Sequence, residues 1–225
     1  MKSKLILVGI LLISLTLSFS SFAAEDEAPN MELPLLTTSA GQSPEIDTLN
    51  LLVDRAEINY DYSDAPTVEI IKEGVGLGGA EPGEDTTFNY VSIGTDTEKY
   101  PKGTPYKTIM FSIGASLKGM GASGLSVGSE TSRLKNILDY AEENEIAVVG
   151  THIGGSARRG EPGSANEKMI DTVAPRSDYL IVTSGGNEDG KFTEIAEEND
   201  IPLKEIDSPL DLVPVLKELF DQPEE

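Results

Sequence analysis

The sequence contains no cysteine and no tryptophan, and it has a single histidine. Without cysteine, disulfide bonds, thiolate metal sites and a cysteine nucleophile are all excluded. A fold made from this chain must therefore be stabilised by its hydrophobic core. His152 cannot build a histidine-rich metal site alone, and although carboxylates could still hold a hard cation, we predict no metal and no cofactor.

Cationic residues are also scarce. The chain has 17 Lys and Arg against 39 Asp and Glu, which gives a formal charge of −22 at pH 7. Such a surface repels phosphate backbones and anionic lipid headgroups, so we expect neither nucleic acid nor a membrane surface as a partner. Protein partners are left open. Any cluster of cations stands out against this background.

Long apolar runs are absent except at the N-terminus. After a short basic start, residues 5–17 are almost entirely aliphatic, and Ser21 and Ala23 fit the small-residue positions of a cleavage site. This pattern predicts a secretory signal peptide at 1–24 and an exported protein, periplasmic or extracellular. The alternative is an uncleaved anchor, but the run is shorter than the ~20 residues that span a bilayer. Cleavage would leave 15 Lys and Arg against 39 Asp and Glu, a charge of −24.

The rest of the chain is long enough for one well-buried domain. We expect a disordered acidic leader at 25–32, a domain at 33–220 and a short tail at 221–225. Residues 64–103 are rich in Gly, Pro, Asp and Thr and break the rhythm of the flanking segments. We interpret them as an insertion, a hairpin or a lid, outside the central sheet and more mobile than its surroundings.

Short apolar runs alternate with amphipathic segments along the domain. The pattern predicts strands at 33–38, 58–62, 106–113, 146–150, 178–183 and 201–206, and helices at 44–57, 129–144, 166–174, 191–199 and 209–220. Such alternation indicates βαβ units and an α/β fold: a three-layer, doubly wound, mostly parallel sheet, Rossmann-like or flavodoxin-like. The strands that begin near 33, 106, 146 and 178 should be parallel neighbours.

The last helix has its own signals. Ser208 followed by Asp211 is typical of a helix cap, and Pro214 predicts a kink or a late start.

The turns that follow the predicted strands carry the functional signal, because ligands of open parallel sheets bind outside the carboxyl ends of the strands. These turns are rich in glycine and small hydroxyls, and two contain cations. Glycine lets the main chain approach a ligand closely, and Ser, Lys and Arg satisfy an oxyanion. We therefore expect a pocket for a small anion: a carboxylate, phosphate or sulfonate. The candidate ligand-binding residues are Ser39, Gly41, Gln42, Ser43, Ser116, Lys118, Gly119, His152, Arg158 and Arg159.

A structural interpretation stands beside this one. Glycine and serine occur in such turns for turn geometry alone. Arg158 and Arg159 could pair with acidic neighbours such as Glu161, and a lone histidine at a strand end is more often structural than catalytic.

Known sequence motifs do not identify a cofactor, a catalytic serine or a calcium site in this chain. Two glycine patterns, at 74–79 and 119–124, match the dinucleotide fingerprint in letters, but neither opens a helix directly after a strand. A G-x-S-x-G nucleophile elbow is absent from the sequence. Residues 187–190 are similar to part of a calcium loop, but Gly185 would occupy its first ligand position.

With those turns in view, the chain resembles a family of exported bacterial domains of unknown function. The resemblance covers roughly 33–220, apart from 64–103, which is longer than the usual pattern. It lies in the segments Ser39-Ala40-Gly41-Gln42-Ser43-Pro44, Ser116-Leu117-Lys118-Gly119-Met120-Gly121-Ala122, His152-Ile153-Gly154-Gly155-Ser156-Ala157-Arg158-Arg159-Gly160, 178–181 and 186–193. It implies the domain type and export, and brings no activity, ligand or catalytic residue.

Three functions are compatible with the sequence. The first is an exported, non-catalytic binding protein for a small anionic metabolite, serving uptake or sensing. The second is a hydrolase or transferase on an anionic substrate, with His152 as acid/base and Arg158, Arg159 and Lys118 as clamps. The third is an interaction module of the cell envelope. Convergence of the turns around a pocket would favour the first two.

Overall fold

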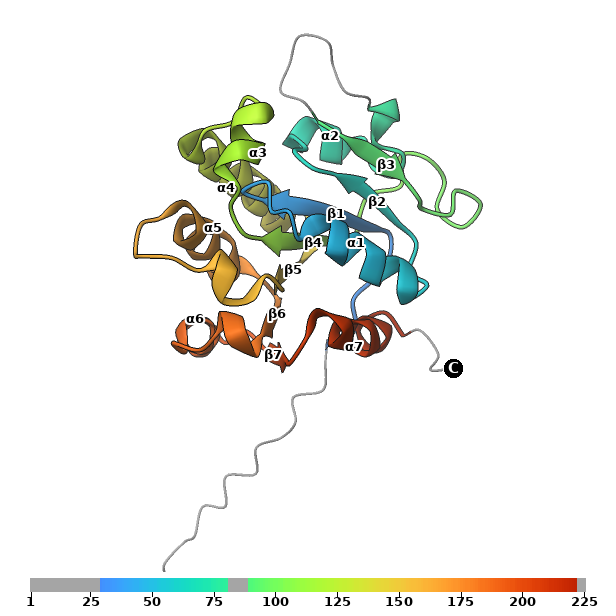
Figure 1. Ribbon diagram of the computed structural model, residues 1–225. Helices are drawn as coiled ribbons and strands as arrows, with labels where there is room; N and C mark the ends of the chain where they lie inside the picture. Colours follow the sequence, from blue (N-terminus) through green and yellow to red (C-terminus); the bar gives the residue numbers. More distant parts are fainter. Residues whose placement is uncertain (1–28, 81–88, 222–225) are drawn as a thin grey trace, which may run out of the picture.

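The computed structural model describes residues 29–80 and 89–221. Its strands form one seven-stranded sheet in the order β3-β2-β1-β4-β5-β6-β7, in which β3 alone is antiparallel to its neighbour (Figure 1). The strands are β1 (Leu35–Ala40), β2 (Tyr60–Ser63), β3 (Val91–Ile93), β4 (Thr108–Ile113), β5 (Ala147–His152), β6 (Tyr179–Thr183) and β7 (Leu203–Ile206). The predicted α/β fold is confirmed, and β1, β4, β5 and β6 are parallel neighbours as expected.

Helices cover both faces of the sheet (Figure 1). They are α1 (Ile46–Arg55), α2 (Val68–Lys72), α3 (Leu117–Ala122), α4 (Val127–Glu143), α5 (Ala165–Val173), α6 (Lys191–Glu198) and α7 (Leu212–Leu219). Among the described residues, no helix has the length and the apolar character that crossing a membrane requires.

Two separate cores result from the alternation of side chains along each strand. Leu35 and Met110 face α1 and α7, whereas their neighbours Leu36 and Ile109 face the side of α4, α5 and α6. Because successive strand residues point to opposite faces, a strand buried on both sides is apolar or small throughout. The fully buried strands β1, β4 and β6 show this.

The strand order places a topological switch point between β1 and β4. The chain leaves β1 through α1 to reach β2 on one side, and then returns across to β4 on the other side of β1. The connections after β1 and β4 run to opposite faces of the sheet, because α1 packs in one core and α3 and α4 in the other. A crevice at the carboxyl ends of these two strands is where ligands of such sheets bind.

The segment 64–103 differs from its expectation. It supplies β3, which pairs with β2 at the edge of the sheet, so part of it belongs to the sheet. It also buries Ile71, Val75 and Leu77 in the core on the α4 side. The glycines and prolines of this segment predicted turns, and its apolar residues are too few and too scattered to show the hydrophobic period of a helix or a strand. Residues 81–88 lie outside the described part.

The ends of the domain also depart from the sequence pattern. The predicted signal peptide and most of the leader lie outside the described residues. At the end of the predicted leader, however, Met31 is buried and its N–H donates to Leu219 O over 2.7 Å. At the other end, Ser208 and Asp211 form the expected cap, and α7 starts late, so that Pro214 falls in its first turn, where a missing N–H costs nothing. The turn after β4 also contains the short helix α3, which the sequence pattern did not predict.

Candidate functional site

The turns that follow β1 and β4 meet at the switch point. Gly114 N donates to Ala40 O over 3.1 Å, and Ser116 N donates to Gly41 O over 2.8 Å. Gly41 has a φ of +90°, and a β-carbon there would lie 2.5 Å from Gly114 O. Only glycine combines that conformation with so close an approach, so this residue brings the two turns into contact.

A carboxylate already occupies the polar groups of this region. Arg158 Nε donates to Glu45 Oε1 over 2.7 Å, and Ser43 Oγ donates to Glu45 Oε2 over 2.8 Å. Ser112 Oγ donates in turn to Ser43 Oγ over 3.1 Å. The side chains of Arg158 and Glu45 are 27% and 20% exposed. Thus two of the predicted anion-binding residues do hold an anion, and it belongs to the chain itself.

Arg158 lies over the glycine turns. Added β-carbons at Gly114 and Gly154 would contact its side-chain carbons, and the one at Gly114 would lie 3.5 Å from Arg158 Cδ. The small residues of both turns therefore make room for the arginine stem. They hold the guanidinium beside Ser43, at the carboxyl ends of β1 and β4.

Ser39 and Gln42 contribute to structure on the other side of the β1 turn. Ser39 is buried and its hydroxyl donates to Asp64 O over 3.0 Å. Gln42 Nε2 donates to the same carbonyl over 3.1 Å, and its Oε1 accepts from Ser123 Oγ over 3.1 Å. These bonds join the turn to the end of β2 and to α3.

Ser116, Gly119 and Lys118 belong to the start of α3. Ser116 caps the helix by accepting from Gly119 N over 3.0 Å. A β-carbon at Gly119 would lie 3.1 Å from Gln42 Cβ, so glycine permits the packing of α3 on the β1 turn. Lys118 is exposed and makes no hydrogen bond or ion pair with the described residues. Lys118 therefore shares no partner with Arg158 among the described residues.

His152 lies behind this region with no exposed surface. Its Nδ1 is 3.0 Å from Ile113 O and its Nε2 is 3.3 Å from Gly155 O, while its ring packs 5.0 Å from that of Phe192. Burial lowers the pKa of His152 and outweighs the two carbonyls, which act in the opposite direction. The imidazole is held neutral, so only one ring nitrogen donates.

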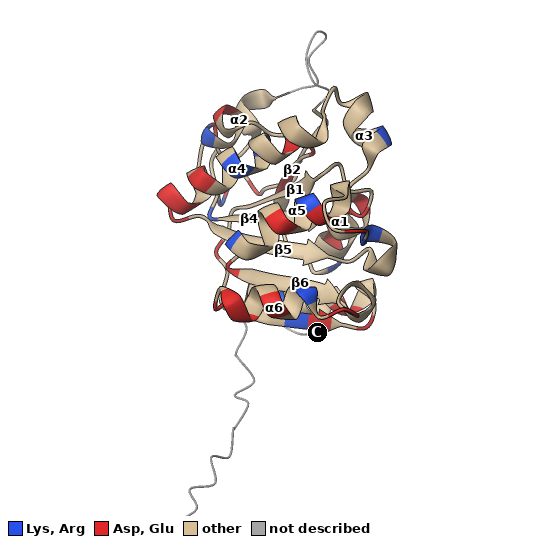
Figure 2. Ribbon diagram, turned by 90° about the vertical axis from the view of Figure 1, so that its left-hand side faces the viewer, with Lys and Arg blue, Asp and Glu red and all other residues tan. Residues whose placement is uncertain are grey.

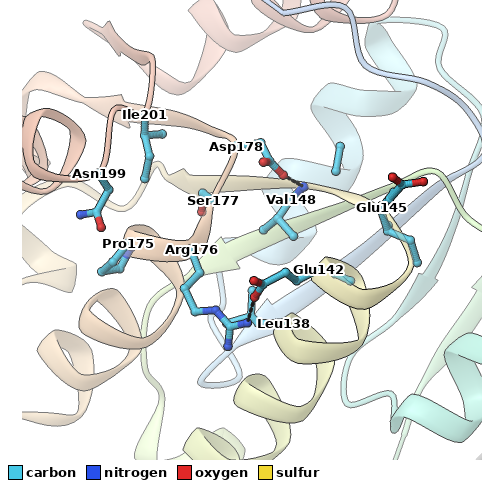
Figure 3. Close-up of a pocket in the computed structure, with 13 residues that line it drawn as sticks. Leu138, Glu142, Glu145, Val148, Pro175, Arg176, Ser177, Asp178, Asn199 and Ile201 are labelled. Atoms are coloured by element: carbon cyan, nitrogen blue, oxygen red, sulfur yellow. Dashed lines mark hydrogen bonds and ion pairs between the residues drawn. The ribbon is translucent and has the colours of Figure 1, made fainter.

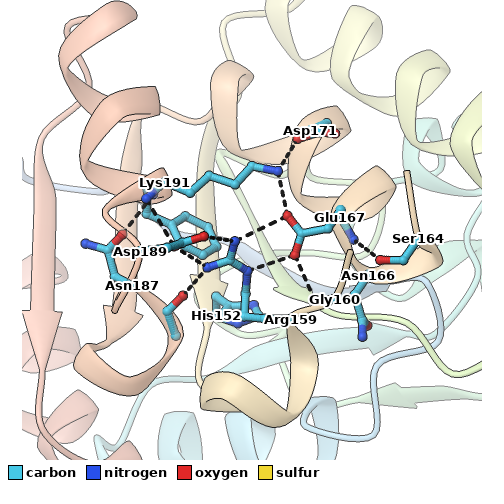
Figure 4. Close-up of polar contacts among 12 residues, drawn as sticks. His152, Arg159, Gly160, Ser164, Asn166, Glu167, Asp171, Asn187, Asp189 and Lys191 are labelled. Atoms are coloured by element: carbon cyan, nitrogen blue, oxygen red, sulfur yellow. Dashed lines mark hydrogen bonds and ion pairs between the residues drawn. The ribbon is translucent and has the colours of Figure 1, made fainter. Parts of the chain in front are cut away.

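Arg159 belongs to an ionic network (Figure 4) and shares no hydrogen-bond partner with Arg158 among the described residues. Its guanidinium donates to Glu167 over 2.9 Å, to Asp189 over 2.7 Å and to Gly186 O over 2.6 Å. Lys191 Nζ also donates to Glu167, over 2.7 Å. These partners, rather than the neighbour Glu161, neutralise Arg159.

The network shifts the pKa of each member. The hydrogen bond from Arg159 lowers the pKa of Asp189 to about 2. Burial alone would raise the pKa of Glu167, but hydrogen bonds from Arg159 and Lys191 outweigh it and lower that pKa. The bond to Asp189 raises the pKa of Arg159 further above its ordinary value. Burial alone would lower the pKa of Lys191, but hydrogen bonds to Asp171 and Glu167 outweigh it and raise that pKa. Arg159, Lys191, Glu167 and Asp189 are therefore all charged at neutral pH, and the network ties the loop after β5 to α5 and to the loop after β6.

Two acidic residues that shape the site, Glu130 and Glu45, were given no role by the sequence pattern. Glu130 has no exposed surface and accepts from Gly41 N over 2.7 Å, and Arg133 bridges it to Ser39 O over 2.8 Å. Glu45 stands in the β1 turn itself. The i, i+3 spacing of Glu130 and Arg133 was a usable signal for an ion pair. The pattern could not show that this pair lies in the core.

Four hollows in the described part of the surface lie elsewhere. A groove of about 670 Å³ opens at the amino ends of β5 and β6, near Arg176, whose guanidinium is held by Glu142 over 2.8 Å (Figure 3). Three further cavities adjoin β7, α7 and α2. None of these four cavities is lined by a predicted site residue. Within the described residues, no group of three or more His, Cys, Asp or Glu could hold a metal ion.

Comparison with known proteins places the chain in a family without giving it an activity. A family model described as a domain of unknown function (DUF6305) matches residues 32–220. No curated protein matches the sequence.

Proposed function

From the premise that this chain belongs to the DUF6305 family of domains of unknown function, we propose that it is an exported binding protein for a small anion, held at the switch point between β1 and β4. The ligand class is a carboxylate, with phosphate and sulfonate as the alternatives that share its oxygen chemistry. Export rests on the N-terminal sequence pattern.

The observation that carries the proposal is the carboxylate of Glu45 between Arg158 Nε and Ser43 Oγ, at 2.7 and 2.8 Å. These are charge-assisted and hydroxyl donors of the kind that bind free carboxylates. Glu45 marks the position and the chemistry of the anion that they accept. A side chain of the protein acts here as the stand-in for a ligand.

Arg158 has further donors for an incoming anion. A guanidinium carries five N–H groups, and only the Nε–H of Arg158 has a partner among the described residues. The Arg158 side chain as a whole is 27% exposed, so solvent reaches part of it. An external carboxylate can engage the remaining N–H groups while Glu45 is still bound, and can then replace Glu45.

Glu45 is therefore an internal competitor. Its side chain is attached at the start of α1 and is 20% exposed, so it can turn out to solvent when a ligand takes its donors. Competition of this kind weakens apparent affinity, because the free protein must release its own carboxylate first. We expect affinity for small anions to be modest in the native chain.

This competition gives the test. Acetate, inorganic phosphate and methanesulfonate are titrated into the protein and followed by NMR shifts and by calorimetry. Glu45→Gln keeps the shape but removes the competing charge, and we expect it to tighten binding of the preferred anion about tenfold. Arg158→Ala should weaken binding about tenfold to a hundredfold, since a charge-assisted bond is worth roughly 1.5–3 kcal/mol.

Arg176→Ala is the matched control. The Arg176 side chain has a similar exposure, 31%, and pairs with Asp139 and Glu142. It lies at the amino ends of β5 and β6, away from the proposed anion site. Its removal should leave anion binding unchanged. If Glu45→Gln fails to tighten binding while Arg158→Ala and Arg176→Ala lose equally little, the Glu45–Arg158 pair is a structural bond between α1 and the loop after β5, and the anion site is abandoned.

The enzymatic alternative has less support. A general acid or base must reach the proton that it transfers. His152 is fully buried, with both ring nitrogens beside main-chain carbonyls. The proposal therefore gives His152 the role of joining the ends of β4 and β5.

A further inference from the structure

The free edge of β7 is a second surface with recognisable chemistry. β7 ends the sheet and pairs with β6 alone among the described strands. Leu180 N donates to Pro202 O over 3.0 Å, so the alternate residues Leu203 and Glu205 present their main-chain N–H and C=O groups to the open side. An open row of such groups is a template for another strand.

Two grooves flank this edge, one on each face of the sheet. The groove between β7 and α6, about 720 Å³, has Ala196, Ile201 and Leu203 in its lining. The groove between β7 and α7, about 570 Å³, has Ile206 and Val215. Side chains of an added strand alternate between the two faces, so each groove would receive every second side chain. Edge hydrogen bonds with alternating pockets are the requirements of strand addition.

The charge of the residues that line the grooves indicates which kind of partner strand would bind there. Their linings include six carboxylates, those of Glu197, Asp200, Glu205, Asp207, Asp211 and Glu218, and Lys204 is the one cation among these described lining residues. Acidic residues are prominent on α6 in Figure 2. A second copy of a chain with a charge of −22 would be repelled from such an edge.

We infer that the β7 edge binds an extended, cationic segment of a partner protein by strand addition. The partner's main chain bonds to Leu203 and Glu205, and its Lys or Arg side chains lie beside the groove carboxylates. This surface is separate from the anion site, because neither groove is lined by Glu45, Ser43 or Arg158. The inference does not depend on the proposed function.

The probe is a short capped peptide of alternating Lys and Val. Its controls are a peptide in which Pro replaces Val, which has the same charge but lacks half of the main-chain donors, and a peptide in which Glu replaces Lys. Binding is followed by NMR, together with hydrogen exchange at the amides of Leu203 and Glu205. We expect the Lys–Val peptide to bind about tenfold more tightly than either control and to protect both amides.

Charge reversal locates the site. Glu197→Lys with Glu218→Lys places one cation beside each groove and should weaken the Lys–Val peptide about tenfold. Glu98→Lys with Glu143→Lys changes the net charge equally at exposed positions away from β7, and should weaken it less than about twofold.

Three results would overturn the inference. Equal binding of the Lys–Val and Lys–Pro peptides would show that charge alone attracts the probe. Equal losses in the two charge-reversed proteins would show that the net charge acts rather than the grooves. Self-association in sedimentation experiments, with protection of the Leu203 and Glu205 amides, would make a second copy the occupant.

Discussion

The carboxylate of Asp64 lies at the end of β2, in a residue that is 8% exposed, and accepts from Tyr90 N over 2.8 Å. Burial raises its pKa from 3.8 to about 6, although the Tyr90 hydrogen bond and the charge of Arg133 act in the opposite direction. The folded protein thus holds this proton more tightly than the unfolded chain does. The stability that this provides is complete below about pH 4 and is lost as the pH rises through about 6.

Asp64→Asn should therefore stabilise the protein at neutral pH. Asparagine keeps an acceptor for Tyr90 N and removes the buried charge, so we expect the free energy of unfolding to rise by about 1–3 kcal/mol near pH 7.5 and not near pH 4. Urea denaturation of both proteins measures it, and their difference cancels the other carboxylates. A loss of stability near neutral pH would mean that attraction by Arg133 exceeds the cost of burial.

At the scale of elements, one buried side chain joins β2 to three other segments. Asp61 has no exposed surface, and its Oδ2 accepts from Gly76 N over 2.7 Å and from the Tyr106 hydroxyl over 2.6 Å. Its Oδ1 accepts from Gly94 N over 3.2 Å and from Thr95 N over 3.0 Å. This carboxylate attaches the irregular segment 64–103 to the sheet.

Asp61→Ala should loosen that segment. Gly76 N, Thr95 N and the Tyr106 hydroxyl would lose their acceptor in a buried site, whereas Gly94 N also donates to Tyr60 O over 3.0 Å. We expect a loss of about 3 kcal/mol in the free energy of unfolding. Hydrogen exchange should accelerate around Gly76 and Gly94 before it does in β5 and β6. The control is Asp96→Ala, which removes an exposed carboxylate that accepts from Glu98 N over 2.9 Å. Equal effects of the two substitutions would contradict the role of Asp61.

At the scale of the whole molecule, repulsion among 39 acidic side chains opposes the compact state, because only 17 Lys and Arg offset them. Salt screens exposed charges more than buried pairs such as Glu130–Arg133, whose side chains are 0% and 9% exposed. Thermal unfolding in sodium chloride should show the melting temperature rising by several degrees between roughly 0.01 and 0.5 M salt. A fall would mean that the screened ion pairs contribute more than the repulsion costs.

Part of the candidate site could be derived from the sequence and part could not. The turns of β1 and β4 were placed together correctly, because the carboxyl ends of neighbouring parallel strands lie at one edge. The partners of the arginines could not be derived. Glu45 lies 113 positions before Arg158, and Asp189 lies 30 positions after Arg159. Charge patterns identify neighbours along a helix, whereas these contacts depend on how whole elements pack.

The sequence by itself determined the alternation of strands and helices and the buried character of β4 and β6. For the last helix Pro214 predicted a kink or a late start, and α7 begins at Leu212. These follow from local stereochemistry and from hydrophobic periods of two and 3.6 residues. Only the tertiary structure decided the strand order, the edge position of β3 and the burial of Asp61. Each of these depends on contacts between residues far apart in the chain, whose energies no local pattern records.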